Sequence, residues 1–308
     1  MLIIPARMPY QLTIQRPVGT EGIGLHTAVP CRMRLVPAPA DTGIVFRRVD
    51  LENFEIEAHV RNVARVSYAT SLMRQGVLLS TTEHVLAALY SCGVDNVYVE
   101  LDALELPILD GSAKPFIDLL ASAGTRRLRR RRRYIRVVKP LEFSDGDRRI
   151  GIYPANEFSV HCFVDYDHPS VGPQEVEMVV DRESFSRELA PARTFGFVKD
   201  FQGLQAMGLI RGGSIDNAIV LDNAKIMNGP LRFPDEFGRH KALDLIGDLA
   251  LVGRPLKARV VAHKAGHALH TQLVTRLLAD RSLWVETTNG HASDSAREPV
   301  SVSVPATR

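Results

Sequence analysis

The chain is organised around one predicted helix, the stretch Arg239-His240-Lys241-Ala242-Leu243-Asp244-Leu245-Ile246-Gly247-Asp248-Leu249-Ala250. At the helical period of about 3.6 residues per turn, His240, Asp244 and Asp248 lie on one face, one turn apart. Apolar residues fill most other positions, which predicts a buried helix. Two interpretations of the polar face are open. In the first, the face is an edge of the helix that meets water, since such i,i+4 pairs are common. In the second, its imidazole and a carboxylate bind zinc together with a third ligand from elsewhere in the chain.

Length and composition indicate an ordinary globular protein. The 308 residues, 45% of them hydrophobic, are enough to bury two cores, so we expect two domains. The N-terminus lacks the extended apolar core of a secretory signal, and we expect a cytoplasmic protein. The three cysteines, Cys31, Cys92 and Cys162, are far apart and odd in number, which argues against a disulfide framework and a cysteine-rich zinc site. Any metal ligands must therefore be His, Asp or Glu.

Positive charge is concentrated in residues 126–133, where seven of the eight residues are arginine. The formal net charge of +3 would be −4 without these seven arginines. Elsewhere the basic residues are not gathered or interleaved with aromatics, which argues against a nucleic-acid partner. Because like charges this dense repel each other and resist packing, we interpret residues 126–133 as a solvated linker. The alternative is a surface that contacts an anionic membrane.

The arginine run divides the chain into two predicted domains, residues 1–125 and 134–308. In each half, strands of alternating apolar residues precede a helix with a histidine near its start, His84 in the first half and His240 in the second. Two α+β domains that face each other across a cleft, with their helices inside, would bring these histidines together.

Two segments of the second half depart from this pattern. At about residues 196–222 we expect a β-α-β insertion, in which a helix with Phe201 and Leu204 on its apolar face lies between two short strands. Such a unit could wall off an apolar passage. From about residue 288 onward, Ser, Thr and Pro are frequent, and we expect a loose tail.

The helix that could supply the third zinc ligand begins at Ser80-Thr81-Thr82-Glu83-His84. Ser80 and Glu83 have the spacing of a capping box, which is the simplest interpretation of Glu83. That interpretation leaves His84 unexplained, and His84 is the ligand that the central helix requires. Glu83 would then lie next to the metal, where a carboxylate can take a proton from water. Both interpretations stay open.

Taken together, the motifs of this chain resemble those of the zinc-dependent UDP-3-O-acyl-N-acetylglucosamine deacetylases of bacterial lipid A synthesis. The resemblance covers nearly the whole chain, through Gly22-Ile23-Gly24-Leu25-His26, Thr82-Glu83-His84, Pro107-Ile108-Leu109-Asp110-Gly111-Ser112-Ala113, Ala192-Arg193-Thr194-Phe195-Gly196-Phe197, Gly212-Gly213-Ser214, Arg239-His240-Lys241 with Asp244, and Ala265-Gly266-His267-Ala268. It implies an α+β fold of two similar two-layer domains whose sheets sandwich their helices, with the active site in the cleft between them.

The resemblance also implies a zinc site and a general base. Zn²⁺ would be bound by His84, His240 and Asp244, and Glu83 would take the proton. Amide hydrolysis needs a nucleophile at neutral pH and an acid for the leaving amine, which agrees with this assignment.

The remaining implied roles concern the leaving group and the substrate. His267, oriented by Asp248, would stabilise charge and donate a proton to the amine, and Thr194 would help to hold the oxyanion. The implied substrate contacts are Lys241, Phe195, Phe201, Leu204, Gly213 and Ile215.

The implied reaction removes the N-acetyl group of UDP-3-O-acyl-N-acetylglucosamine and releases acetate. Two alternatives are open: a zinc amidase of the same fold that acts on another N-acyl sugar, and a non-catalytic protein that binds a lipid-linked sugar nucleotide. The apolar insertion argues against the first, because a short polar substrate needs no passage. The second would be expected to have lost Glu83 or a metal ligand. We expect a monomer with no nucleic-acid partner.

Overall fold

The computed structural model describes residues 9–288 and has an α+β fold, which confirms the predicted class. The elements of the first half are β1 (Tyr10–Ile14), β2 (Val18–Ile23), β3 (Pro30–Pro37), β4 (Ile44–Arg48), β5 (Phe54–Glu57), β6 (Val63–Arg65), β7 (Ser71–Arg74), β8 (Val77–Leu79), α1 (Glu83–Ser91), β9 (Val97–Leu101), α2 (Lys114–Ala123) and β10 (Thr125–Arg131). Those of the second half are β11 (Tyr134–Val137), β12 (Leu141–Asp145), β13 (Arg148–Pro154), β14 (Ser159–Tyr166), β15 (Gly172–Val179), α3 (Arg182–Ser184), β16 (Phe195–Phe197), α4 (Val198–Ala206), β17 (Ile219–Leu221), α5 (Glu236–Leu249), β18 (Leu256–His263), α6 (His267–Ala279) and β19 (Trp284–Thr287). Single helical turns lie at Val49–Leu51, Val60–Asn62, Phe185–Leu189 and Ala250–Val252.

The two halves repeat one strand order. The first sheet has the order β2-β3-β9-β4-β5, and the second contains the order β12-β13-β18-β14-β15. In both sheets the fourth strand of this order pairs in parallel with the third, β4 with β9 and β14 with β18. In both halves a helix precedes the central strand and another follows it. This repeated order is what a pair of similar domains requires, although the division at residues 125 and 134 stays a prediction.

The arginine run is not a linker, and that part of the prediction is wrong. Residues Thr125–Arg131 form β10, which pairs antiparallel with β1 as β19 pairs with β11 in the second half. Arg132 is half-buried, and its Nε donates to Asp95 Oδ1 at 2.8 Å. Arg127 and Arg131 lie over the ring of Tyr10. The repulsion argument failed because it treated the arginines alone, whereas their partners come from distant parts of the chain.

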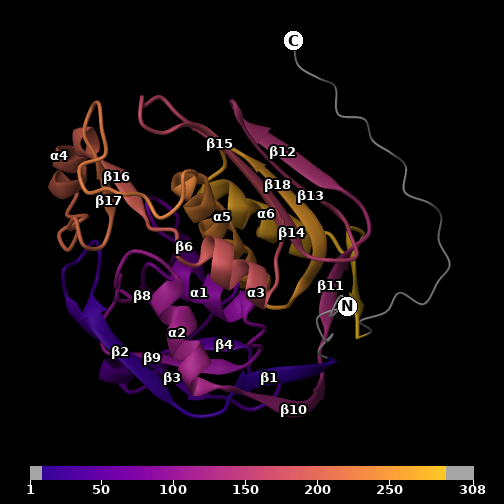
Figure 1. Ribbon diagram of the computed structural model, residues 1–308. Coiled ribbons are helices and arrows are strands. Elements are labelled where there is room, and N and C mark those ends of the chain that lie inside the picture. Colours follow the sequence, from indigo (N-terminus) through magenta and orange to yellow (C-terminus); the bar gives the residue numbers. More distant parts are fainter. Residues whose placement is uncertain (1–8, 289–308) are drawn as a thin grey trace.

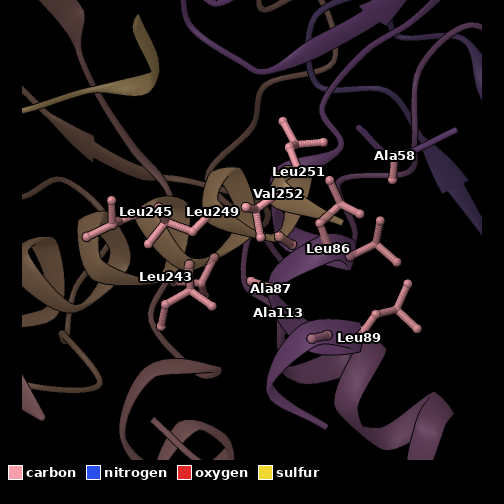
Figure 2. Close-up of a cluster of buried hydrophobic side chains, with 14 of the residues drawn as sticks. Ala58, Leu86, Ala87, Leu89, Ala113, Leu243, Leu245, Leu249, Leu251 and Val252 are labelled. Carbon is pink, nitrogen blue, oxygen red and sulfur yellow. The ribbon is translucent and has the colours of Figure 1, made fainter. Parts of the chain in front are cut away.

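Helices α1, α2, α5 and α6 lie between the two sheets (Figure 1). One apolar cluster continues from Ile14 to Trp284, and in it residues of α1 meet those of α5 and the turn that follows it. Figure 2 shows Leu86 and Ala87 of α1 near Leu249 and Val252. The sheets present one face to this core, as the alternating burial along β3 shows. α1 and α5 therefore cross in the centre of the molecule.

Each half carries a small insertion between its fifth strand and its central helix. In the first half, β6, β7 and β8 form an antiparallel three-stranded sheet. In the second, β16 and β17 pair in parallel with α4 between them, at the far end of the molecule from β10 (Figure 1). The tail expected from about residue 288 lies, from residue 289 on, outside the described residues. None of the helices in residues 9–288 is both long and apolar enough to cross a membrane.

Candidate active site

Three buried side chains meet where α1 crosses α5, in a geometry that suits a metal ion. His84 Nε2 lies 3.6 Å and His240 Nε2 lies 3.4 Å from the same oxygen, Asp244 Oδ1. Zinc binds such ligands tetrahedrally at about 2.0–2.2 Å, which places neighbouring ligand atoms roughly 3.4 Å apart. Two imidazoles and one carboxylate are also a donor set that zinc favours. These residues therefore fit the ion that the sequence predicts.

The surroundings of the donor set leave its metal-facing atoms free to bind. His240 Nδ1 is 3.1 Å from the carbonyl oxygen of Ala192, so Nδ1 carries the proton and Nε2 carries the lone pair. Burial lowers the pKa of His240 to about 3, which keeps the ring neutral. Burial opposes ionisation of Asp244, but attraction to the ammonium group of Lys241 holds its pKa well below the usual range. Lys241 Nζ donates to the other oxygen, Asp244 Oδ2, at 2.8 Å.

Asp248, one turn further along α5, organises a second buried cluster. Its Oδ2 accepts hydrogen bonds from Nδ1 of His267 at 2.7 Å and of His270 at 2.8 Å. The hydroxyl of Thr70 donates to Oδ1 at 2.5 Å. Both histidines direct a protonated nitrogen at one shared oxygen, so this cluster is a hydrogen-bond network and the His84 cluster is the better metal site. Burial opposes protonation of His267, but attraction to Asp248 raises its pKa to about 9.

Glu83 opens α1 beside both clusters. The capping-box interpretation is wrong, because the N-cap is Thr82 and no side chain caps this helix. The Thr82 hydroxyl instead donates to the carbonyl of Thr70, and Glu83 Oε2 accepts from the Thr70 backbone N–H at 3.1 Å. Burial raises the pKa of the Glu83 carboxyl. The side chain is therefore a buried carboxylate held at one oxygen, with the other left for a ligand.

The close approach of the two central helices depends on Gly247. A Cβ at this position of α5 would overlap the backbone carbonyl oxygen of Glu83. Because glycine leaves this space empty, the first turn of α1 reaches Asp244 and Asp248. The sequence placed Gly247 within the helix, but it gave no indication of this contact.

A cleft of about 960 Å³ contains these residues and opens between the two halves. Among the predicted site residues it is lined by Glu83, His84, Thr194, Phe195, His240, Lys241, Asp244 and His267. The other predicted substrate residues, Phe201, Leu204, Gly213 and Ile215, belong to the insertion and do not line this cleft. Apolar wall residues that sequence reasoning missed are Val60, Val63, Val66 and Phe143. The three-residue spacing of the valines was the only available signal for them.

Thr194 is fixed by contacts with both halves. Its backbone N–H donates to the carbonyl of Gly111 at 2.8 Å. The preceding residue, Arg193, donates through its backbone N–H and its Nε to Glu236 Oε1, at 3.0 and 2.9 Å. Glu236 is fully buried at the start of α5. The helix that carries His240 therefore also holds the segment that carries Thr194.

Sequence reasoning missed several polar residues of the site. Thr70, Glu236 and Glu105 are buried and make several hydrogen bonds each, but none stands in a local pattern that predicts it. His270 could have been found, since it follows His267 by three residues and shares a helix face with it.

Comparison with known proteins gives one consistent result. The family model described as LpxC, UDP-3-O-acyl N-acetylglycosamine deacetylase, matches residues 11–279. The UDP-3-O-acyl-N-acetylglucosamine deacetylase of Solibacter usitatus is 54% identical over 278 residues, which are 90% of this chain and 94% of that protein. The protein of the same name from Anaeromyxobacter sp. is 46% identical over 96% of this chain and 97% of that protein. The one from Myxococcus xanthus is 44% identical over 89% of this chain and 88% of that protein.

Proposed function

Because this chain belongs to the UDP-3-O-acyl N-acetylglycosamine deacetylase family, we propose that it hydrolyses the N-acetyl group of UDP-3-O-acyl-N-acetylglucosamine in lipid A biosynthesis. The products are acetate and UDP-3-O-acyl-glucosamine. One observation carries the proposal: the donor set of His84, His240 and Asp244 lies in one cleft with Glu83 and His267. Amide hydrolysis requires these three functions together, a place for a metal, a base and an acid.

The proposed cofactor is Zn²⁺, held by His84 from the first half and by His240 and Asp244 from the second. When bound, zinc would polarise the amide carbonyl and favour deprotonation of water near neutral pH. The 3.4 and 3.6 Å separations of the donor atoms support this choice. Lys241 neutralises charge at the free oxygen of Asp244 and would also contact the substrate.

Glu83 and His267 each carry out one of the two proton transfers, Glu83 as the base and His267 as the acid. Glu83 takes a proton from the water whose oxygen attacks the amide carbon, and its raised pKa makes it a better base than an ordinary carboxylate. His267, held protonated by Asp248, donates a proton to the nitrogen as the carbon–nitrogen bond breaks. Without that proton the leaving group would be an amine anion. The hydroxyl of Thr194 donates to the oxygen that gains charge.

The acyl chain is proposed to lie along the insertion, against Phe201, Leu204, Gly213 and Ile215, with Phe195 at the cleft. Every side chain of α4 is at least partly exposed, and Ile215 is 63% exposed. Apolar side chains that the protein does not use for its own packing are available to an apolar ligand. This supports the acylated substrate over a short polar one.

Acetate release from UDP-3-O-acyl-N-acetylglucosamine tests the proposal. We expect release with purified protein, loss on treatment with a chelator, and recovery on addition of zinc. Glu157→Gln, which changes an exposed carboxylate, serves as the control for variants of the site. Absence of acetate release from the zinc-loaded protein, or release that a chelator does not affect, would contradict the proposal.

We further infer a cytoplasmic monomer whose β10 surface meets an anionic membrane. Arg126, Arg127, Arg129 and Arg131 are exposed on β10, and within residues 9–288 none of them pairs with a carboxylate. Unpaired arginines near an anionic surface contribute about 1 kcal/mol each. The Tyr10 ring is already covered by two of them, so the aromatic ring on the neighbouring strand β1 is not free to stack on a nucleic-acid base.

Vesicle flotation at low salt tests this surface. Arg126→Gln/Arg129→Gln should bind phosphatidylglycerol vesicles roughly 30-fold more weakly than wild type, from about 1 kcal/mol per arginine. The matched control is Arg32→Gln/Arg34→Gln, because these exposed arginines already pair with Asp102 and Glu100. Equal binding by both variants, or tighter binding to duplex DNA than to vesicles, would contradict the inference. Light scattering after gel filtration checks the monomer.

A further inference from the structure

A buried carboxylate outside the catalytic set connects two parts of the site. Glu105 is 1% exposed. Its Oε1 accepts from the Thr81 hydroxyl at 2.8 Å and from the His26 backbone N–H at 2.9 Å. Its Oε2 accepts from the backbone N–H of Thr27 at 2.8 Å and from the Thr27 hydroxyl at 2.7 Å. Among the described residues no lysine or arginine forms an ion pair with Glu105, so neutral donors alone compensate the loss of hydration.

One side of this carboxylate holds a strained residue at the start of the catalytic helix. Thr81 has a φ of 60°, a left-handed conformation that β-branched residues rarely adopt. It immediately precedes Thr82, the N-cap of α1, and Glu83. A strained conformation persists only where its surroundings hold it. The hydrogen bond to Glu105 Oε1 is the side-chain contact that holds Thr81.

The other side holds the loop of residues 24–28, on which the insertion docks. The backbone N–H of Gly212 donates to the carbonyl of Leu25 at 3.0 Å, and that of Arg211 donates to the carbonyl of His26 at 3.2 Å. A Cβ at Gly212 would overlap the carbonyl oxygen of Gly24, so the two backbones touch without intervening side chains. Any displacement of this loop must therefore displace residues 210–213.

We propose that Glu105 is a positioning residue that fixes the Glu83 end of α1 and the docking site of the insertion relative to each other. The inference rests on the proposed function, because it assigns the acyl chain to the insertion and proton transfer to Glu83. Through Thr81 the carboxylate controls the position of the base. Through Thr27 and His26 it controls the position of the insertion, along which the acyl chain is proposed to lie, relative to that base.

Glu105→Gln is the central variant, because it keeps the shape of the side chain and removes one acceptor. An amide group accepts at one oxygen only. In either orientation its NH₂ would face a backbone N–H of the loop, that of His26 or that of Thr27. The side chain and the loop must therefore move apart, and the contact with Thr81 shifts with the side chain. We expect a loss of ~10²-fold in kcat/KM for a long-chain substrate, the size of effect that a misplacement of about 1 Å causes.

Two further variants separate the two sides of Glu105. Thr81→Val should lower kcat about tenfold for long-chain and short-chain substrates alike, because it releases only the base. Thr27→Val should lower kcat/KM about tenfold for the long-chain substrate and leave the short-chain substrate near wild type. Glu105→Gln should combine both effects. The proposal would be overturned if Thr27→Val and Thr81→Val changed the ratio of kcat/KM for the long-chain substrate to kcat/KM for the short-chain substrate equally.

Asp95→Asn is the matched control, since Asp95 is a half-buried carboxylate that pairs with Arg132 away from the cleft. It should lower the melting temperature but leave both kcat/KM values unchanged. A Glu105→Gln variant that behaves in the same way would show a merely structural role and refute the proposal.

Hydrogen exchange makes the test independent of the substrate. In Glu105→Gln, exchange at residues 81–84 and at residues 210–213 should accelerate together, whereas Thr81→Val should affect only the first segment and Thr27→Val only the second. If the wild type shows no preference for long chains, the proposed acyl passage fails, and the exchange result still decides the role of Glu105. Unchanged exchange at either segment in Glu105→Gln would overturn that role.

Discussion

Glu83 is the residue whose function can be isolated most cleanly by one substitution. Glu83→Gln keeps the size of the side chain and removes its ability to take a proton. We expect kcat to fall by ~10²–10⁴-fold, the usual contribution of a general base, while zinc content measured by atomic emission stays at one per chain. His84→Ala, by contrast, should lower zinc content. Near-normal turnover of Glu83→Gln would assign Glu83 to a structural role.

The pKa values of the same two residues predict a bell-shaped pH profile. Glu83 must be ionised to act as a base, and because burial raises its pKa, kcat/KM should fall on the acidic side earlier than for an ordinary carboxylate. His267 must be protonated, so kcat/KM should fall again as the pH passes its pKa of about 9. Asp248→Asn removes the negative charge that favours the imidazolium, and the alkaline limb should move to lower pH. An unmoved alkaline limb would exclude His267 as the acid.

At the scale of elements, the crossing of α1 and α5 predicts an unusual effect of a helix-favouring substitution. Alanine is better than glycine in a helix by about 1 kcal/mol, yet Gly247→Ala should lower the melting temperature and the zinc content. The reason is the overlap of its Cβ with the Glu83 carbonyl, which forces the helices apart. Gly203→Ala in α4 is the control, because open space surrounds that position and the variant should be at least as stable as wild type. Similar outcomes for both variants would contradict the packing argument.

The insertion carries the second prediction at this scale. Ile215 is 63% exposed, so Ile215→Trp should leave the melting temperature unchanged. If the acyl chain lies against Ile215, the bulky ring should penalise a long-chain substrate by about tenfold or more in kcat/KM, since each covered methylene contributes about 0.8 kcal/mol. A short-chain substrate does not reach the ring and should be unaffected. Equal losses on both substrates in a stably folded variant would exclude the passage and favour an amidase that acts on another N-acyl sugar.

At the scale of the whole molecule, the metal is expected to join the two halves. His84 belongs to the first half and His240 and Asp244 to the second, so zinc held by these three residues would bind the native state much better than the unfolded chain. Chelation should therefore lower the melting temperature in calorimetry, and zinc should restore it. His84→Ala should melt at one temperature with or without chelator. A wild-type melting temperature that does not respond to a chelator would contradict the site.

Local periodicity and residue type were enough to predict several elements and the polar face of the central helix. The apolar pattern of residues 239–250 predicted α5, and one turn of spacing placed His240, Asp244 and Asp248 on its face. Alternating apolar residues predicted strands before α1 and before α5, because a strand with one buried face imposes that pattern locally. The absence of a cysteine pair limited the metal ligands to His, Asp or Glu, and the resemblance to the deacetylase family implied His84, His240 and Asp244.

Which distant groups meet became apparent only in the folded chain. The arginine run forms β10 and the residues after it, where its partners Tyr10, Asp41 and Asp95 lie far away in the sequence but close in space. Folding brought Thr70 to Glu83 and Asp248, and it brought Glu105 to the loop of residues 24–28. The physical reason is that a local pattern reports which face of a segment is buried, whereas hydrogen bonds, ion pairs and the contact at Gly247 depend on partners that chain folding alone brings within reach.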